Sequence, residues 1–357
     1  MNLVSIGQHI VATTAQRRRP PRPERAGFPP RRILVVRLKQ LGDLICALPL
    51  YRTLQANWPE AQIDWLLSSQ NAPLAPFLRA QGNIFVLPKI RLRYWLPKQL
   101  LRDLQAQRYH LSLAVKGGFD SLLAWVSLAA AAQQRIGFVS KEKRFLDLAY
   151  TKPCPPPDSH QHQVEKCLEL IDDFRLPKRS DDISLGVPAS AREKIRTLLH
   201  DWKIDEAKAF AVFQLSSTKR SFCRWPVEYF IELGKKLLAE GVPVCINALP
   251  HERRLGEKLR EVLGPTAHVA SFADMAAYLA FLAATRVVIG SDGGGIHLAA
   301  AMGAHTVGFY AESHPMKWRP WQGKHIQFYT ANRDVREVTP AQVWQELCAA
   351  GWLGSES

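Results

Sequence analysis

The sequence lacks a hydrophobic run long enough to cross a membrane. Its longest apolar stretch, at residues 122–132, has 11 residues, which are too few to span a bilayer. No apolar segment separates the first residues from an arginine cluster, so we expect no secretory signal. The sequence therefore predicts a soluble, cytoplasmic protein that can still touch a membrane surface.

Paired cysteines are also absent. The sequence has six cysteines, at positions 46, 154, 167, 223, 245 and 348. They are widely spaced, no CxxC occurs, and several lie within apolar segments such as LICALPL. We expect reduced, buried thiols rather than a disulfide framework or a zinc site. The HQH triplet at 160–162 has no third partner at helical spacing, so we interpret it as a connector.

Acidic residues are few relative to basic ones. The chain has 47 Lys and Arg against 32 Asp and Glu, a formal net charge of +15. This excess implies an anionic partner: nucleic acid, an acidic membrane face or a phosphorylated substrate. The Pro/Arg tract at 17–32 contributes seven arginines and cannot build a core, so we expect residues 1–30 to be a disordered basic tail. The absence of helix-turn-helix, zinc-finger and RNP signatures argues against nucleic acid.

Apolar residues are plentiful, and they are arranged in two series. The 357-residue chain is 47% hydrophobic, enough for two domains. In the first series we expect strands at 32–38, 61–69, 83–88 and 110–118, and helices at 44–58, 96–107, 120–132 and 163–175. In the second we expect strands at 209–217, 242–249, 267–271, 286–291 and 305–310, and helices at 226–240, 251–263, 274–284, 296–302 and about 340–350.

Strands that alternate with helices predict two doubly wound α/β domains. Residues 150–163 form a proline-rich connector, and 176–190 are the best candidate for a linker. We expect an N-terminal domain at 31–178 and a C-terminal domain at 190–357, whose last helix can pack back on the first domain. Ligands of such sheets bind outside the carboxyl ends of the strands, so we expect the functional site in the cleft between the domains.

The first chemical motif is RLKQLGDLICALP (37–49). Gly42 permits a tight turn at the end of a strand, and Asp43 stands beside the following helix. Two interpretations have about equal weight: Asp43 is an N-cap, or it is a general base that faces the cleft.

The second motif is GSDGGGIHLAAAMG (290–303). Free backbone N–H groups and the helix dipole attract phosphate at a helix start, and three glycines would permit close approach of a diphosphate. His297 could donate to a phosphate oxygen, although a lone histidine in a turn is more often structural. Neither GxGxxG nor a P-loop occurs, so a plain strand-to-helix turn remains the alternative.

The third motif is QLSSTKRSFCRWP (214–226), in which hydroxyls and cations follow a strand. Ser216, Ser217, Lys219 and Arg224 suit a diphosphate, and the alternative is a solvated basic loop. A fourth stretch, KIRLRYWLPKQLLRDLQ (89–105), suits an anionic membrane surface or acceptor, but an ordinary amphipathic surface helix is the more common explanation.

Residues 31 to about 350 resemble glycosyltransferase family 9, the ADP-heptose:lipopolysaccharide heptosyltransferases. The resemblance rests on RILVVRLKQLGDLICALPLYRTL, RIGF, HQVEKCLELIDDFRL, CRWP and GSDGGGIHLAAAMGAHTVGFYAESHPMKWRPW. It implies a GT-B fold with two facing Rossmann-like domains, the acceptor on the first and the nucleotide-sugar on the second. It also implies an inverting transfer that needs no metal or other cofactor.

The resemblance assigns roles to individual residues. Asp43 matches the base that deprotonates the acceptor hydroxyl. Asp292 to His297 match the donor turn, and Glu252 matches an acid near the adenosine. The donor side would comprise Ser216, Ser217, Lys219, Arg224, Glu252, Asp292, Gly293, Gly294, Gly295 and His297, and the acceptor side Lys39, Gly42 and Lys116.

The chain also departs from the family pattern. Cys223 stands where a lysine is common, so the phosphate contact would have to come from neighbouring cations. Gly293 replaces a Ser or Thr, Gly295 replaces a frequent proline, Lys39 and Gln40 replace small hydroxyl residues, and Asp120 replaces a basic residue on the acceptor side.

These observations favour one function over two others. We expect transfer of heptose from ADP-heptose to an anionic glycolipid, the lipopolysaccharide inner core, at the inner face of the bacterial inner membrane. The first alternative is a family 9 enzyme that uses another nucleotide-sugar to build a different surface glycan. The second is a non-catalytic basic binding protein.

Overall fold

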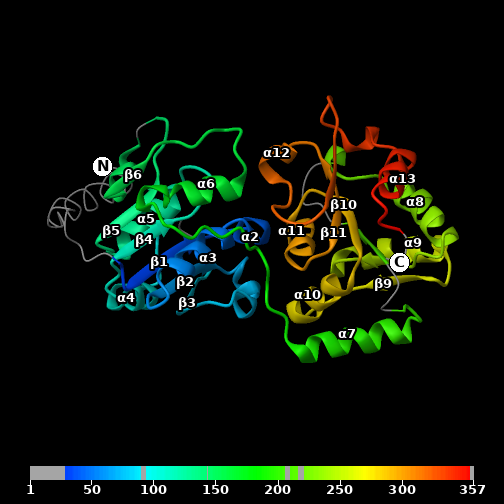
Figure 1. Ribbon diagram of the computed structural model, residues 1–357, viewed down its shortest axis with the longest axis horizontal. Helices are drawn as coiled ribbons and strands as arrows, with labels where there is room; N and C mark the ends of the chain where they lie inside the picture. The colour runs from blue at the N-terminus through cyan, green and yellow to red at the C-terminus, as the bar shows by residue number, and fades with distance from the viewer. Residues whose placement is uncertain (1–28, 90–93, 143, 206–209, 216–220, 354–357) are drawn as a thin grey trace. The chain divides into compact units, whose positions relative to one another are not determined.

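A computed structural model describes residues 29–89, 94–142, 144–205, 210–215 and 221–353 (Figure 1). The basic tail expected at 1–30 therefore lies outside the described residues except for its last two. The chain divides into two compact units after Asp182, within the stretch where we expected a linker.

The first unit is a parallel sheet flanked by helices (Figure 1). Its strands are β1 (Arg32–Arg37), β2 (Gln62–Ser68), β3 (Ile84–Leu87), β4 (Leu111–Ala114), β5 (Gln134–Phe138) and β6 (Lys152–Cys154). Its α-helices are α2 (Leu41–Ile45), α3 (Leu48–Asn57), α4 (Lys98–Ala106), α5 (Ser121–Ala129) and α6 (Gln163–Glu169). Short 3₁₀ turns are η2 (Ala72–Phe77), η3 (Phe145–Ala149) and η4 (Asp172–Phe174).

The first sheet has the order β3-β2-β1-β4-β5-β6, with every pair parallel. The apolar run ILVV of β1 is fully buried because helices cover both faces of such a sheet. Successive strands run outward from β1 to β3 and then outward in the other direction from β4 to β6. The strand order therefore reverses between β1 and β4, and a ligand-binding crevice of a doubly wound sheet opens at such a point.

The second unit repeats this plan. Its strands are β7 (Ala211–Gln214), β8 (Val244–Asn247), β9 (Ala267–Ala270), β10 (Val287–Ser291), β11 (His305–Tyr310) and β12 (His325–Tyr329). Its α-helices are α7 (Ala189–Asp201), α8 (Val227–Ala239), α9 (Arg253–Leu263), α10 (Met275–Ala284), α11 (Gly294–Ala301), α12 (Pro315–Trp318) and α13 (Pro340–Ala349). The 3₁₀ turns are η5 (Ser221–Cys223), η6 (Pro250–Glu252) and η7 (Val335–Glu337).

The order of the second sheet is β12-β11-β10-β7-β8-β9, again all parallel. This is the same topology as in the first unit, because β7 and β10 occupy the places of β1 and β4. The order reverses between β7 and β10. The loops that follow these two strands are the two motifs for which we predicted phosphate binding.

The last helix, α13, packs within its own unit. Val343 and Leu347 are fully buried in the core cluster that contains Leu233 and Leu237 of α8. The apolar face of α13 is thus buried against α8, and packing of this helix on the first domain stays a prediction.

The two predicted series lacked the strands β5, β6 and β12 and the helices α7 and α12. The edge strand β6 begins inside the expected proline-rich connector, where Pro153 pairs with Gly137 of β5. Proline is tolerated at an edge because one side of the strand needs no ladder hydrogen bond. Helix α7 starts at the end of the expected linker and packs on α10.

Part of the basic aromatic stretch at 89–105 forms the amphipathic helix α4. Leu100 and Leu104 of this helix are buried in the core, while Tyr94 and Trp95 just before it are exposed. Nowhere in the described parts of the chain is there a helix both long and apolar enough to traverse a bilayer.

Candidate active site

A buried arginine organises the carboxyl end of β1. Arg37 is 1% exposed, and its Nη2 lies 3.0 Å from Oδ1 of Asp43. Its Nε donates to the carbonyl of Asp43 at 2.9 Å, and its Nη1 donates to the carbonyl of Val115 at 2.7 Å. One guanidinium therefore links the ends of β1 and β4 and fixes the Asp43 carboxylate at the point where the strand order reverses.

Asp43 is not an N-cap. Helix α2 begins at Leu41 with Gln40 as its N-cap, so Asp43 is the third helical residue. Its carboxylate binds Arg37 across the turn rather than a backbone N–H at the helix start, and its side chain is 16% exposed. Of the two interpretations left open by the sequence, the N-cap is wrong, and a carboxylate oriented by a fixed cation remains.

Lys39 and Lys116 meet at one carboxylate. Their ammonium groups lie 2.8 and 2.7 Å from the same oxygen, Oδ2 of Asp120. The other oxygen of Asp120 caps helix α5 by accepting the N–H groups of Leu122 and Leu123. Burial by itself raises the pKa of Asp120, but the hydrogen bonds from Lys116 and Lys39 outweigh it and hold the pKa well below its usual range.

In the second unit, the glycine turn leads from β10 into helix α11. Gly293 is the N-cap of α11 and, as a glycine, has no side chain with which to cap the helix. The N–H of Asp292 donates to the carbonyl of Phe309 in β11 at 2.9 Å, so the turn is tied to the neighbouring strand. Since the N–H groups of a first helical turn have no partner within the helix, this turn presents donors and the positive end of the helix dipole.

The side chains of Asp292 and His297 are buried beside this turn. Asp292 is 8% and His297 4% exposed. The rings of His297 and Trp318 form a T-shaped pair, with 6.5 Å between their centroids. His297 thus has a packing role, and a contact with a phosphate stays a prediction.

Gln214 was not anticipated from the sequence. It is the last residue of β7, it is buried, and its Oε1 accepts from Nδ2 of Asn247 at 2.6 Å and from the hydroxyl of Tyr278 at 3.1 Å. A Cβ on Gly295 would lie 2.9 Å from the end of this side chain. Because Gln214 fills the space over the start of α11, position 295 has no room for a side chain. The sequence does contain a signal for Gln214: it is a polar residue at the end of an apolar strand, next to the point where the strand order reverses.

Gly293, in contrast, is not required by packing. A Cβ there would meet only the carbonyl oxygen of Ser291, at 3.8 Å, and the backbone is extended, with φ 176°. We expect Gly293→Ser to leave the free energy of unfolding unchanged or raise it by a few tenths of a kcal/mol, since a serine can cap α11. Gly295→Ser should lower it by about 1–3 kcal/mol through its clash with Gln214. Urea denaturation measures both, and equal losses in the two variants would contradict this distinction.

The loop between β7 and α8 is described from residue 221 onward. Ser216, Ser217 and Lys219 lie outside the described residues. Arg224 is exposed, whereas Cys223 is buried in the apolar core of the second unit. The indole of Trp225 stacks on Phe309, and its Nε1–H donates to the carbonyl of Val338 at 2.8 Å. The backbone N–H of Trp225 donates to the hydroxyl of Ser291 at 3.2 Å. The loop is thereby anchored to β10 and β11.

Glu252 follows β8 and ends η6. Its Oε2 accepts from the N–H of Leu249 at 3.2 Å, and its Oε1 lies 3.8 Å from Nε2 of His251. The carboxylate is thus held at the same edge of the sheet as the glycine turn, two strands away.

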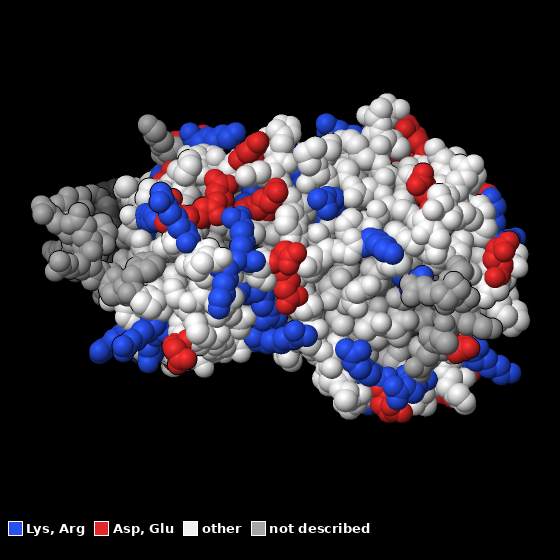
Figure 2. All heavy atoms as spheres, in the orientation of Figure 1, with Lys and Arg blue, Asp and Glu red and all other residues white. Residues whose placement is uncertain are grey.

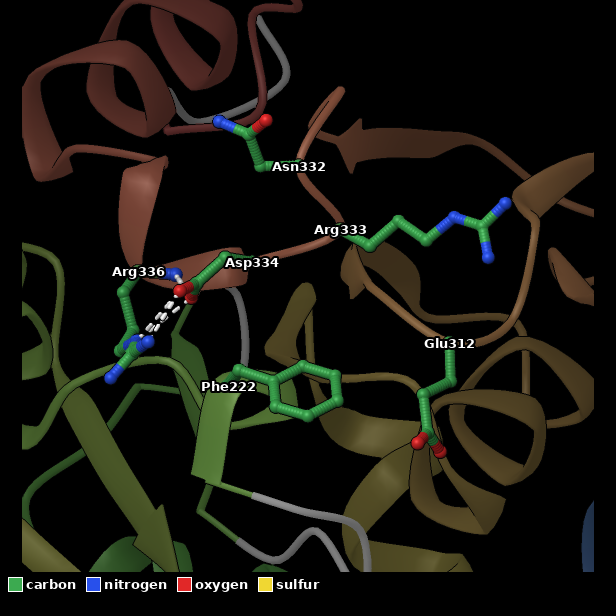
Figure 3. A pocket seen from close by; sticks show the side chains of 6 residues that line it. All are labelled: Phe222, Glu312, Asn332, Arg333, Asp334 and Arg336. Carbon is green, nitrogen blue, oxygen red and sulfur yellow. Dashed lines mark hydrogen bonds and ion pairs between the residues drawn. The ribbon is translucent and has the colours of Figure 1, made fainter.

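A hollow of about 630 Å³ opens beside η5 (Figure 3). Phe222, Glu312 and Arg333 surround it together with Asn332, Asp334 and Arg336. Several of these polar side chains bind neighbouring side chains. Arg336 forms a bidentate pair with Asp334, and Nδ2 of Asn332 donates to Oε1 of Glu337.

Charged side chains of both signs cover much of the first unit in Figure 2, whereas a large part of the second unit's visible face is uncharged. The net positive charge therefore does not form a single uniform basic surface on this face. Among the residues with a described placement, no three His, Cys, Asp or Glu side chains gather as metal ligands would. His162 of the HQH triplet caps helix α6 by accepting the N–H of Val164.

Comparison with known proteins identifies the class as a glycosyltransferase. The model of glycosyltransferase family 9 (heptosyltransferase) matches residues 98–345, more than half of the chain. The chain belongs to this family, as the resemblance of its motifs indicated.

Curated relatives and solved structures agree. The chain is similar to lipopolysaccharide heptosyltransferase 2 of Escherichia coli K12, with 24% identity over 89% of this chain and 98% of the relative. It is 23% identical to lipopolysaccharide heptosyltransferase 1 of the same strain, over 80% of this chain and 89% of the relative.

Among solved structures, the family 9 glycosyltransferase of Veillonella parvula matches with a TM-score of 0.79 at 15% identity, over 90% of this chain and 97% of that one. The E. coli ADP-heptose LPS heptosyltransferase II matches with a TM-score of 0.72 at 22% identity, over 90% and 98%. These likenesses show the fold, which is GT-B.

Proposed function

We propose that this protein transfers heptose from ADP-heptose to the anionic inner core of lipopolysaccharide, with inversion at the transferred carbon. The family and its heptosyltransferase relatives support the reaction class. The net charge of +15 is suited to an anionic glycolipid and to work at the cytoplasmic face of the inner membrane.

The observation that carries the proposal is the glycine turn at the start of α11. The N–H groups of the first turn of α11 follow a glycine N-cap next to β7, where the strand order of the second sheet reverses. A diphosphate is the ligand that such a turn suits best. Arg224 in the neighbouring loop is exposed and supplies a cation.

In the first unit, Asp43 is the proposed general base. Arg37 binds its Oδ1 and orients the carboxylate, so Oδ2 would accept the proton of the acceptor hydroxyl as that oxygen attacks the sugar. The transition state would have oxocarbenium character, as in glycoside hydrolysis, and attack opposite the departing diphosphate inverts the configuration.

The departing ADP acquires negative charge as the bond to the sugar breaks. We propose that the N–H groups of the α11 turn and the cations of the β7–α8 loop stabilise this charge in place of a metal ion. Transfer by purified protein should then proceed equally well in excess EDTA, and restoration of a lost activity by Mg²⁺ or Mn²⁺ would refute this part.

The deciding experiment is a panel of nucleotide-sugars with purified core acceptors, with products detected by mass spectrometry. Heptosylation of the acceptor and release of ADP are expected. Transfer of a different sugar would establish the alternative of another surface glycan. Binding of acceptor without product from any donor would favour a non-catalytic binding protein.

His297→Ala should weaken ADP binding by about tenfold or more, because one hydrogen bond to a charged group contributes about 1.5–3 kcal/mol. Isothermal titration with ADP measures this. His305→Ala is the matched control, since His305 begins β11 at the opposite end of the sheet and packs on Trp352. Equal ADP affinity in the His297 variant and the wild type would remove His297 from the donor site.

A further inference from the structure

Two lysines that share one buried carboxylate form an unusual arrangement in the first unit. Lys39 stands two residues after β1, and Lys116 two residues after β4, the strands between which the order reverses. Because each ammonium lies within 2.8 Å of Oδ2 of Asp120, the two nitrogens are at most about 5.5 Å apart. Like charges this close repel each other, so the carboxylate between them is what holds the pair together.

Both carboxylate oxygens of Asp120 accept hydrogen bonds in this arrangement, whereas each lysine gives only one of its three N–H donors to Asp120. The side chain of Asp120 is 3% exposed, with Oδ1 on the start of α5 and Oδ2 on the two ammonium groups. The side chains of Lys39 and Lys116 are 47% and 33% exposed. An ammonium has three donors, and Asp120 takes one from each lysine. The cluster carries a net positive charge that faces outward.

The backbone of Lys39 supplies an independent observation. Its φ is +81°, in the left-handed region that a lysine seldom adopts. Ser68 holds this conformation, because its hydroxyl contacts both the N–H of Lys39 at 3.0 Å and the carbonyl at 3.3 Å. A glycine would adopt it without strain. The chain keeps a lysine there, and its side chain reaches Asp120.

The cluster also lies beside the proposed base. Arg37 binds Asp43 on one side and the carbonyl of Val115, the residue before Lys116, on the other. An anion held by the two lysines would therefore belong to a molecule that is bound near Asp43.

We propose that Asp120 is a positioning residue that holds Lys39 and Lys116 as an ammonium pair, and that this pair binds one oxyanion of the acceptor, a phosphate or a carboxylate. The inference rests on the proposed function for its choice of ligand. Asp120 neutralises one of the two ammonium charges and leaves the cluster with a net charge of about +1. It sets the spacing of the two cations.

The kinetic test is Asp120→Asn. Asparagine is a good N-cap, so α5 should keep its cap while the negative charge is lost. We expect the KM for the acceptor to rise about tenfold, with kcat and ADP affinity within twofold of wild type. Asp274→Asn is the matched control, because Asp274 caps α10 in the same way. An acceptor KM as low in Asp120→Asn as in the control would overturn the proposal.

Lys39→Gly separates binding from folding. The variant relieves the left-handed strain but removes one of the two cations on Asp120, so its midpoint of urea unfolding should stay close to that of the wild type, while the acceptor KM rises by about tenfold. Lys39→Arg, which keeps the charge, should recover part of that loss. An unchanged KM in Lys39→Gly would show that the lysine has no role in binding.

A measurement that does not depend on turnover distinguishes failure of this proposal from failure of the proposed function. Lysines are labelled by reductive ¹³C-methylation, and the Lys39 and Lys116 signals are assigned with Lys→Arg variants. The protein is saturated with ADP to occupy the donor turn and is titrated with inorganic phosphate and, separately, with acetate. Both lysine signals should shift together in the wild type and require at least tenfold more anion in Asp120→Asn. The anion that saturates the shifts at the lower concentration, phosphate or acetate, indicates whether the acceptor group is a phosphate or a carboxylate. If Asp120→Asn does not change the concentration dependence of the shifts, the proposal is overturned, even if heptose transfer is confirmed.

Discussion

Replacing Asp43 by Asn is expected to lower kcat for sugar transfer by about 10²–10⁴-fold, the range that general-base catalysis commonly contributes. Asparagine has nearly the same shape, and its amide oxygen can still accept from Arg37, so the turn should persist. Only the proton acceptor is lost. ADP affinity should stay within twofold of wild type, because Asp43 belongs to the first unit and the donor turn to the second.

The control for this variant is Asp103→Asn on α4, where the half-buried aspartate accepts from Nε2 of Gln99 at 2.7 Å. Single-turnover transfer with saturating donor and acceptor separates chemistry from binding. A kcat for Asp43→Asn that falls less than tenfold would remove Asp43 from the role of base. The same loss in the Asp103 control would point to a general effect of charge.

Arg37→Met is expected to lower the free energy of unfolding by about 3–5 kcal/mol, because removing one partner of a buried ion pair leaves the other charge uncompensated. Methionine fills part of the volume but replaces none of the three interactions with Asp43 and Val115. Urea denaturation followed by circular dichroism measures the loss.

A second variant tests whether the unpaired charge is the cause. Arg37→Met combined with Asp43→Asn should be more stable than Arg37→Met alone, since the double variant no longer leaves a carboxylate without its cation. Recovery should be partial, because the carbonyls of Asp43 and Val115 still lack their donor. If the double variant is the less stable of the two, the ion pair is not what Arg37 contributes.

Much of the fold could be read from local patterns. Apolar β-branched runs such as ILVV in β1 are buried on both faces, and the helical runs between them have one apolar side, as in α4. The missed elements are those whose pattern is weak. The short edge strand β6 contains a proline, and half-buried β12 has the mixed sequence HIQFY. These segments form strands because they pair with a neighbouring strand. That neighbour is distant in the sequence, so a pattern read over a few consecutive residues does not reveal the pairing.

The candidate site was predictable only in part, for the same reason. Asp43 and the turn at 292–295 were found because a loop directly after a strand of a doubly wound sheet lies at its binding edge. The partners of these residues come from elsewhere in the chain. Gln214 lies against Gly295 although 80 positions separate them, and Asp120 receives Lys39 across a similar distance.

The sequence by itself determined the class of fold, the family, and the two segments that carry the chemistry, because strand-helix alternation and glycine-rich turns are local properties. Only the tertiary structure decided what each side chain does. It showed that Asp43 is not a helix cap but a carboxylate bound by Arg37, and that Cys223 lies in the core. It also joined two lysines through Asp120. The physical reason is that parallel strands bring the ends of distant segments together. At those ends, the charge of a side chain is paired, and the space around it is filled, by residues from another segment.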